Sequence, residues 1–298
     1  MARLQAMQVF VKVAESGGFA EAARQLNMSP PAVTRAVALL EEGLGARLFT
    51  RTTRVVRLTE VGQRYFDDCQ KILSYIEEAD AVASGSYSEA KGSLTVTASV
   101  LFGQMYVMPI LQEYLEQNSQ VVGKSLFLDR VTNLVEEGVD VALRIGHLSD
   151  SGLAAIRVGE VRRVICGSPK YFEQHGAPSV PQDLAGHRIV AATSAWTNLE
   201  WRFGRERKVS TMVEPRLFCN SNQAVIDAAR SGWGLTRILS YQIGAELRDG
   251  DLQIVLADYE EEPLPIHVVH PEGRRASAKV RAFVDLAVDR LRANRLLN

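Results

Sequence analysis

Polar residues that directly follow β-prone runs are the side chains in this sequence best placed to do chemistry. Ser99 follows LTVTA, Thr193 and Ser194 follow HRIVAA, and Asn220 and Ser221 follow RLFC. A helix is expected to begin directly after each run. The hydroxyls and free backbone N–H groups at such helix starts suit a carboxylate or a similar anion. Taken singly, each residue is more readily explained as an ordinary helix N-cap.

A second set of candidate residues lies at the end of the run VDVALRIG: Arg144, Gly146 and His147. We expect it to border the same anion site. Arg144 also fits a structural ion pair within its own domain.

Motifs of catalysis and of metal binding are absent from the sequence. There is no G-x-S-x-G elbow, no G-x-x-x-x-G-K-[ST] phosphate loop and no H-E-x-x-H zinc motif. His267 and His270 would face opposite sides of a strand-like run. The cysteines, Cys69, Cys166 and Cys219, are odd in number and far apart, which leaves packed thiols or a redox pair rather than a disulfide framework. We therefore expect no enzyme, no metal and no cofactor.

The length and the charge distribution indicate more than one domain. A chain of 298 residues, 46% hydrophobic, can bury a sizeable core and exceeds one average domain. Residues 1–66 hold nine basic and five acidic side chains, a net charge of +4, whereas the whole chain has a net charge of −1. A basic module on an acidic body suggests a polyanion-binding surface, because phosphate contacts supply the sequence-independent part of DNA affinity.

The basic module has the pattern of a helix-turn-helix. Apolar spacing predicts a helix that ends at Gly17-Gly18, a second helix in FAEAARQL, and a third from about Pro30 with Ser29 as its N-cap. The core face of the third helix is expected to comprise Val33, Ala36, Val37 and Leu40. Thr34 and Arg35 then stay exposed near its start, which is the layout of a DNA reader.

The next run, RLFTRTTRVVRLT, predicts a two-stranded wing around Thr52-Thr53. Residue types alone also fit a small helical bundle with a solvated basic hairpin. However, FVKVAESGGFAEAARQL, SPPAVTRAVALLEEGLGARLF and RTTRVVRLTEVGQRYF follow one another between Phe10 and Phe66. This ordered series resembles the DNA-binding region of LysR-type transcription regulators and favours the winged helix-turn-helix.

The resemblance implies a set of DNA-binding residues. On the recognition helix and on the wing these are Ser29, Pro30, Pro31, Thr34, Arg35, Arg51, Thr53 and Arg54. Arg35 could bond a guanine edge in two places, whereas the wing residues are expected to meet phosphates and the minor groove. Pro30 replaces a Gln frequent in the family, so a hydrogen bond to a base is lost there. Gly43 stands where a polar or charged residue is usual and is expected to fray the helix end.

A long helix is predicted to follow, capped by Thr59 and running to about Ser84. Its apolar residues recur in steps of three and four, a pattern typical of a seam between paired helices. The seam residues are Tyr65, Cys69, Ile72, Ile76 and Ala79. Packing of this helix on its own domain is the alternative. The resemblance implies a linker helix that joins two subunits, and residues 84–93 are interpreted as a hinge.

From Ser93 the pattern changes to β-prone runs that alternate with helices, including helices at about Val100–Gln117 and around Val131–Glu137. We expect an α/β fold with mainly parallel sheets in two lobes, the last strand and helix returning to the first lobe. This part resembles the LysR effector domain, itself similar to periplasmic solute-binding proteins, in which a small ligand lies between the lobes. The resemblance brings the polar strand ends into one cleft.

The predicted domains are a winged helix-turn-helix at 1–58, a linker helix and hinge at 59–91, and an effector-binding domain at 92–298. Lobe 1 is expected to comprise 92–162 and 267–298, and lobe 2 163–266.

The sequence therefore predicts a LysR-type DNA-binding transcriptional regulator whose operator binding responds to a small, anionic effector. No signal peptide and no membrane span of about 18 apolar residues is recognised, so we expect a cytoplasmic protein. Their absence, with the N-terminal module, argues against a solute-binding transport protein. The expected partners are double-stranded DNA, the effector, a second copy of the chain as homodimer or homotetramer, and RNA polymerase, with no membrane.

Overall fold

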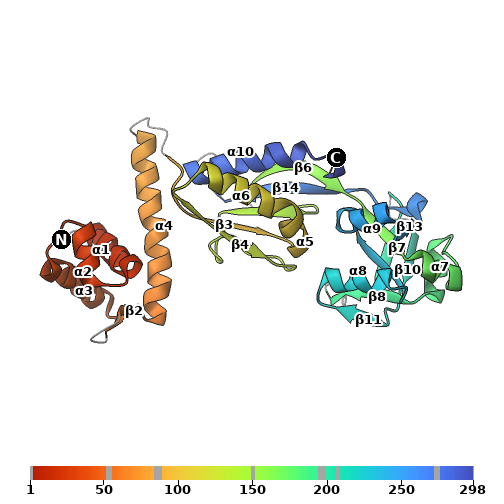
Figure 1. The fold of residues 1–298 in the computed structure, drawn as a ribbon, viewed down its shortest axis with the longest axis horizontal. Helices are drawn as coiled ribbons and strands as arrows, with labels where there is room; N and C mark the ends of the chain where they lie inside the picture. Colours follow the sequence, from red (N-terminus) through yellow and green to blue (C-terminus); the bar gives the residue numbers. More distant parts are fainter. Residues whose placement is uncertain are drawn as a thin grey trace. The chain divides into compact units, whose positions relative to one another are not determined.

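The computed structural model shows a mixed α/β protein and divides into two compact units, Met1–Ser88 and Glu89–Asn298 (Figure 1). It describes residues 3–51, 56–83, 89–148, 152–193, 199–205, 209–271 and 276–297. Within these residues no helix combines the length and the apolar character needed to cross a membrane.

The first unit contains the three predicted helices and the two wing strands. Its elements are α1 (Arg3–Ser16), α2 (Phe19–Gln25), α3 (Pro30–Leu44), β1 (Phe49–Arg51), β2 (Val56–Leu58) and α4 (Glu60–Ala83). β1 and β2 pair antiparallel. The predicted core face of α3 is confirmed, since Val33, Ala36, Val37 and Leu40 are all buried.

At the ends of α3, one expectation was wrong and the other was confirmed in position only. Gly43 does not fray the helix, which continues to Leu44 and ends where Gly45 takes a left-handed φ of 64°. Ser29 occupies the N-cap position, but its hydroxyl makes no capping hydrogen bond. The two prolines have no N–H group to be capped, and the next one, the Ala32 N–H, donates to the Ser29 carbonyl at 2.9 Å instead.

Helix α4 begins as predicted, since the Thr59 hydroxyl accepts the Gly62 N–H at 2.9 Å. Its first turns, however, pack on their own subunit. Cys69 is completely buried in the core of the first unit, and the Tyr65 ring lies 5.5 Å from that of Phe10. Cys69 therefore has no surface left for a dimer seam. Tyr65 is half-buried, and its place in a seam stays a prediction.

The remaining seam positions differ in what the structure shows of them. Ile72 is 40% exposed and Ile76 is half-buried. The side chain of Ala79 lies outside the described part of the chain.

The second unit holds two five-stranded sheets, each the centre of one lobe. Lobe 1 has the order β4-β3-β5-β14-β6 and lobe 2 the order β11-β8-β12-β7-β13. The strands of lobe 1 are β3 (Gly92–Ala98), β4 (Val121–Phe127), β5 (Val141–Ile145), β6 (Ala154–Val161) and β14 (Leu264–His270). Those of lobe 2 are β7 (Arg163–Gly167), β8 (Ile189–Ala192), β11 (Leu217–Cys219), β12 (Leu235–Leu239) and β13 (Gln253–Val255).

Each sheet is mixed rather than mainly parallel. In lobe 1, β3, β4 and β5 are parallel, whereas β14 runs antiparallel to β5 and β6. In lobe 2, β8, β11 and β12 are parallel and β7 is antiparallel to β12 and β13. A short hairpin of β9 (Glu200–Phe203) and β10 (Val209–Met212) was not predicted.

Helices cover the sheets. The predicted helix over Val100–Gln117 is present as α5 (Val100–Phe102), a π-helical turn (Gly103–Val107) and α6 (Met108–Gln117). The last strand and α10 (Ala278–Arg292) return to lobe 1 as expected, and α6 lies beside α10 (Figure 1). The other helices are α7 (Pro169–His175), α8 (Asn222–Arg230) and α9 (Gly244–Asp249), with 3-10 turns at Pro181–Gly186, Ser240–Ile243, Ala257–Tyr259 and Arg295–Leu297.

The helix expected around Val131–Glu137 is wrong, because this segment makes only one turn. The Asn133 side chain accepts the Val135 N–H at 3.2 Å, and Gly138 ends the turn with a φ of 63°. Asn favours such local turns over a continued helix.

Candidate functional site

The exposed side of α3 carries the residues expected to read DNA. Ser29, Pro30, Pro31 and Arg35 are exposed and Thr34 is half-buried, while Val33 is completely buried. Among the described residues Arg35 has no hydrogen-bond or ion-pair partner, so its guanidinium donors are available for a base edge.

The wing is described only at its strands. Phe49, Thr50 and Arg51 pair with Leu58, Arg57 and Val56. Thr53 and Arg54 lie outside the described residues, as does the Arg51 side chain.

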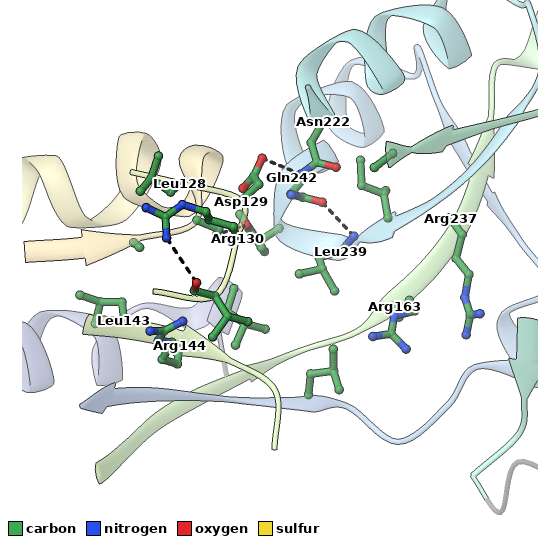
Figure 2. Close-up of a pocket in the computed structure, with 18 of the residues that line it drawn as sticks. Leu128, Asp129, Arg130, Leu143, Arg144, Arg163, Asn222, Arg237, Leu239 and Gln242 are labelled. Atoms are coloured by element: carbon green, nitrogen blue, oxygen red, sulfur yellow. Dashed lines mark hydrogen bonds between the residues drawn. The ribbon is translucent and has the colours of Figure 1, made fainter. Parts of the chain in front are cut away.

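A cavity of about 560 Å³ lies in the second unit, lined by both lobes (Figure 2). This volume is within the range of small-molecule sites. The wall is built at strand ends: Thr97 to Ser99 at the end of β3, Leu128 to Thr132 after β4, Leu143 to Ile145 in β5, Ala191 to Ala192 in β8, and Leu239, Tyr241 and Gln242 at the end of β12 and just after it. Ligands of α/β sheets bind at such carboxyl ends of parallel strands.

Two of the predicted effector residues, Ser99 and Arg144, lie on this wall. Ser194 is outside the described residues. The structure does not place the remaining predictions at the wall, and these are Gly146, His147, Thr193, Asn220 and Ser221.

The wall is formed a residue or two away from these positions. Ala192 lines the cavity in place of Thr193, and Asn222 in place of Ser221. Ser221 has the structural role instead, because its hydroxyl accepts the Ala224 N–H at 3.4 Å as the cap of α8.

The helix start after Ser99 is already occupied by a carboxylate of the chain itself. The Val100 N–H donates to Asp129 Oδ1 at 3.0 Å, and Asn222 of lobe 2 donates to Asp129 Oδ2 at 3.2 Å (Figure 2). The Ser99 hydroxyl lies 3.4 Å from that of Tyr241, whose pKa burial raises to about 12. Asp129 and Tyr241 therefore connect the two lobes beside the cavity, and the Val100 N–H is not available to a ligand.

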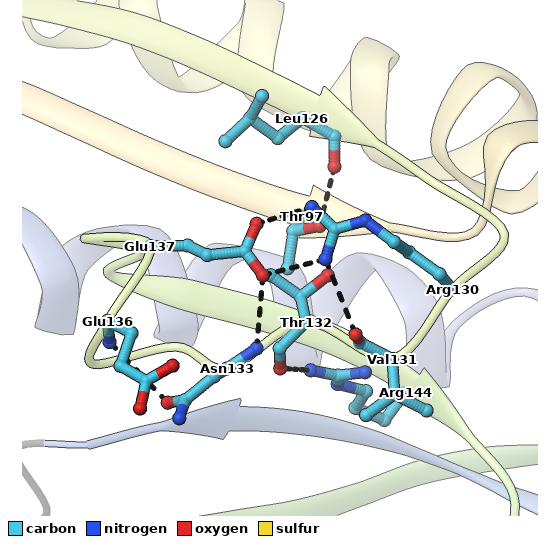
Figure 3. Close-up of polar contacts among 9 residues, drawn as sticks. All are labelled: Thr97, Leu126, Arg130, Val131, Thr132, Asn133, Glu136, Glu137 and Arg144. Atoms are coloured by element: carbon cyan, nitrogen blue, oxygen red, sulfur yellow. Dashed lines mark hydrogen bonds and ion pairs between the residues drawn. The ribbon is translucent and has the colours of Figure 1, made fainter.

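The guanidinium of Arg144 lines the cavity and makes no ion pair at contact distance with a carboxylate of the described residues, although the charge of Glu137 acts on it. It donates to the carbonyl oxygen of Thr132 (Figure 3). Burial lowers the pKa of Arg144, but arginine stays charged at neutral pH. Arg130 is the contrast, since both its terminal nitrogens bind the Glu137 carboxylate, at 2.8 and 2.7 Å. Of these two arginines, Arg144 is thus the one that no carboxylate holds by hydrogen bonds.

Sequence reasoning missed a second basic cluster on the wall. Arg163 and Arg237 both donate to Glu261 Oε2, at 2.7 and 2.6 Å. The Arg237 guanidinium also lies 5.5 Å from the ring centre of Trp201. The runs Arg162-Arg163 and Glu260 to Glu262 are visible in the sequence, but only the fold brings them together where the chain crosses between the lobes.

Both units match described families. Residues 4–63 match the bacterial regulatory helix-turn-helix proteins of the lysR family, and residues 88–292 match the LysR substrate binding domain.

Full-length relatives agree with these matches. An uncharacterized HTH-type transcriptional regulator of Haemophilus influenzae is 32% identical and covers 94% of this chain and 98% of its own. The HTH-type transcriptional regulator CrgA of Neisseria meningitidis is 30% identical, with 97% of each chain covered. The solved structure of CrgA, a LysR-type transcriptional regulator, has a TM-score of 0.62 and covers 97% of this chain and 99% of its own. The full-length structure of AphB, a virulence activator of Vibrio cholerae, is 25% identical and has a TM-score of 0.60 with the same coverage.

The first unit carries an exposed reading helix and a wing, the second a ligand-sized cavity, and both match the family over nearly the whole chain. The protein is therefore a member of the LysR family, a DNA-binding transcriptional regulator with an effector-binding domain rather than an enzyme.

Proposed function

We propose that this LysR-type regulator binds a small anionic effector in the 560 Å³ cavity and that binding changes its contacts with operator DNA. The observation that carries the proposal is the Arg144 guanidinium. It lines the cavity, is bound by the Thr132 carbonyl and makes no ion pair at contact distance with a carboxylate of the described residues. A guanidinium offers five donors in a fixed fork that fits a carboxylate or a phosphate.

The coupling follows from where the cavity lies. Its wall takes residues from both lobes, so a ligand that contacts both favours one relative arrangement of the lobes. A ligand shifts such an equilibrium only by its difference in affinity for the two arrangements, typically ~1–3 kcal/mol. The change in transcription is therefore graded and reversible.

Assembly and location complete the proposal. The regulator acts in the cytoplasm as a homodimer or homotetramer, with operator half-sites read by the paired modules of residues 1–58. Residues 59–91 join the subunits and residues 92–298 hold the effector. Contact with RNA polymerase stays a prediction.

A thermal-shift screen of metabolites, followed by titration against variants, tests the effector site. Arg144→Ala and Ser99→Ala should raise the concentration of each anionic hit needed for half saturation, about tenfold or more for Arg144, because a charge-assisted hydrogen bond is lost. Ser221→Ala is the matched control, since Ser221 is absent from the wall and only caps α8.

The same titrations can refute the proposal. If every hit binds wild type and Arg144→Ala with equal affinity, the effector does not bind at Arg144 in this cavity. Consumption of the hits on incubation would instead favour an enzyme.

A further inference from the structure

A buried carboxylate in the DNA-binding unit lies where the reading helix, the wing and helix α4 meet. Glu41 is on α3 and only 4% exposed, which is rare for a charged side chain unless its oxygens are satisfied. Its Oε1 accepts the backbone N–H groups of Leu48 at 2.8 Å and Phe49 at 3.2 Å. Its Oε2 accepts from Arg47 Nη1 at 3.1 Å. The carboxylate thus holds the chain as it enters strand β1.

The opposite side of the same segment is held from the start of α4. The Thr59 hydroxyl donates to the Arg47 carbonyl at 2.8 Å, and the Thr59 N–H donates to the Leu48 carbonyl at 2.9 Å. The Thr59 hydroxyl also accepts the Gly62 N–H at 2.9 Å. A side chain at Gly62 would bring its Cβ within 2.0 Å of the Leu48 oxygen, so the helix and the wing base approach as closely as their backbones allow.

Residues 47–49, which we name the wing base, are therefore fixed from two helices at once. Glu41 of α3 accepts the N–H groups of Leu48 and Phe49, and Thr59 ahead of α4 donates to the carbonyls of Arg47 and Leu48. The Phe49 ring adds an apolar anchor, with its centre 5.2 Å from that of Phe10. Charge-assisted bonds of this kind are stronger than neutral ones, so the wing base cannot shift relative to α3 without a large cost.

We propose that Glu41 is a positioning residue for DNA binding. It touches no DNA itself, but it sets the wing at the distance and angle from α3 that let the wing arginines reach the phosphates while Arg35 reaches a base. Thr59 extends the same connection to α4, so a reorientation of α4 moves the wing together with the reading helix.

The test is a double-mutant cycle on the full-length protein. Glu41→Gln keeps an oxygen acceptor and the size of the side chain but loses the charge, and Glu42→Gln changes the exposed neighbouring carboxylate as a control. Each is combined with Arg54→Ala and with Arg35→Ala, and binding to the DNA upstream of the protein's own gene is measured against salt concentration. A non-additive change identifies residues that act through one another.

Glu41→Gln is expected to bind roughly tenfold more weakly, with a salt slope lower by about one unit, because wing phosphate contacts are lost. In that background Arg54→Ala should cost little more, while Arg35→Ala should keep its full cost. Glu42→Gln should match the wild type. The proposal is overturned if Arg54→Ala costs the same with and without Glu41, or if both arginines lose their effect together, as a general loss of structure would cause.

Thr59 supplies the second pair of variants if Glu41→Gln does not fold. In the Thr59→Ala background, Arg54→Ala should cost little further DNA affinity, as in Glu41→Gln. In the Thr59→Ser background, which keeps the hydroxyl, Arg54→Ala should have its full cost again. Wild-type DNA affinity of Thr59→Ala with an unchanged salt slope would equally contradict the proposal that Glu41 and Thr59 together hold the wing base.

Discussion

At the residue scale, the role of each arginine depends on what already holds its guanidinium. Arg130 and Arg144 both line the cavity, yet Arg130 is bound by Glu137 through both terminal nitrogens and Arg144 by the Thr132 carbonyl. Sequence reasoning selected Arg144 because it ends a strand, with an ion pair as the alternative. Among the described residues, the structure shows no such pair.

Arg35 and Arg54 should bind DNA in different ways, which mutation can separate. Arg35→Ala should cost ~1–3 kcal/mol at one base position, since an exposed arginine at the start of α3 can bond a guanine edge. Arg54→Ala should weaken binding to all sequences alike and lower the salt slope by about one. Gel-shift assays across single-base operator variants distinguish the two. An unchanged ranking of operator variants with Arg35→Ala would show that α3 is not the reading helix.

His187 should make the stability of the second unit depend on pH. Burial, followed by the charge of His175, lowers the pKa of His187 below its ordinary value of 6.5. The unfolded chain therefore takes up this proton first, and the free energy of unfolding should fall as the pH drops below about 6.5. Urea unfolding at pH 7.5 and pH 5.5 measures the loss, which His187→Gln should reduce. The same loss in both proteins would exclude His187 as a cause.

At the element scale, local patterns predicted the DNA-binding unit well because its signals are local. Its helix boundaries and core face are set within one or two turns by Pro30 and Pro31, by Gly17 and by the apolar spacing of α3. The segment after β4 was mispredicted because the Asn133 side chain and Gly138 favour a single turn over the apolar pattern. Strand β6 was not recognised, since it pairs with β14, which lies far later in the chain. The β9–β10 hairpin was also not recognised, although its two strands are neighbours in the chain.

The site was predicted only in outline for the same reason. The expectation of polar side chains at strand ends correctly placed Ser99 and Arg144 at the cavity wall. The same expectation did not include Asp129, Arg163 and Tyr241, because these residues reach the wall only through the packing of one lobe against the other.

Helix α4 should divide into a part that stabilises its own unit and a part that pairs subunits. Ile72→Glu with Ile76→Glu should separate dimers in sedimentation, because like charges would face each other across the seam. Cys69→Ala, in contrast, should lower the thermal stability of the first unit and leave the oligomer intact, since Cys69 is completely buried within one subunit. An unchanged oligomer in the double glutamate variant, with operator affinity intact, would refute pairing through α4.

At the scale of the whole molecule, regulation by an effector requires two sites that influence each other. The DNA-reading surface belongs to the first unit and the cavity to the second, so the effector can act on DNA only through a change of arrangement. Such coupling is reciprocal: the factor by which the effector changes DNA affinity must equal the factor by which DNA changes effector affinity.

Calorimetric titration of an anionic screening hit into the regulator, with and without saturating DNA from upstream of its gene, measures this factor directly. We predict dissociation constants that differ about 5- to 150-fold between the two titrations, matched by the same factor in DNA binding with and without the hit. Arg144→Ala should weaken the hit in both titrations while leaving ligand-free DNA binding unchanged. Identical dissociation constants with and without DNA would contradict the account, because the cavity and the DNA-reading surface would then be independent.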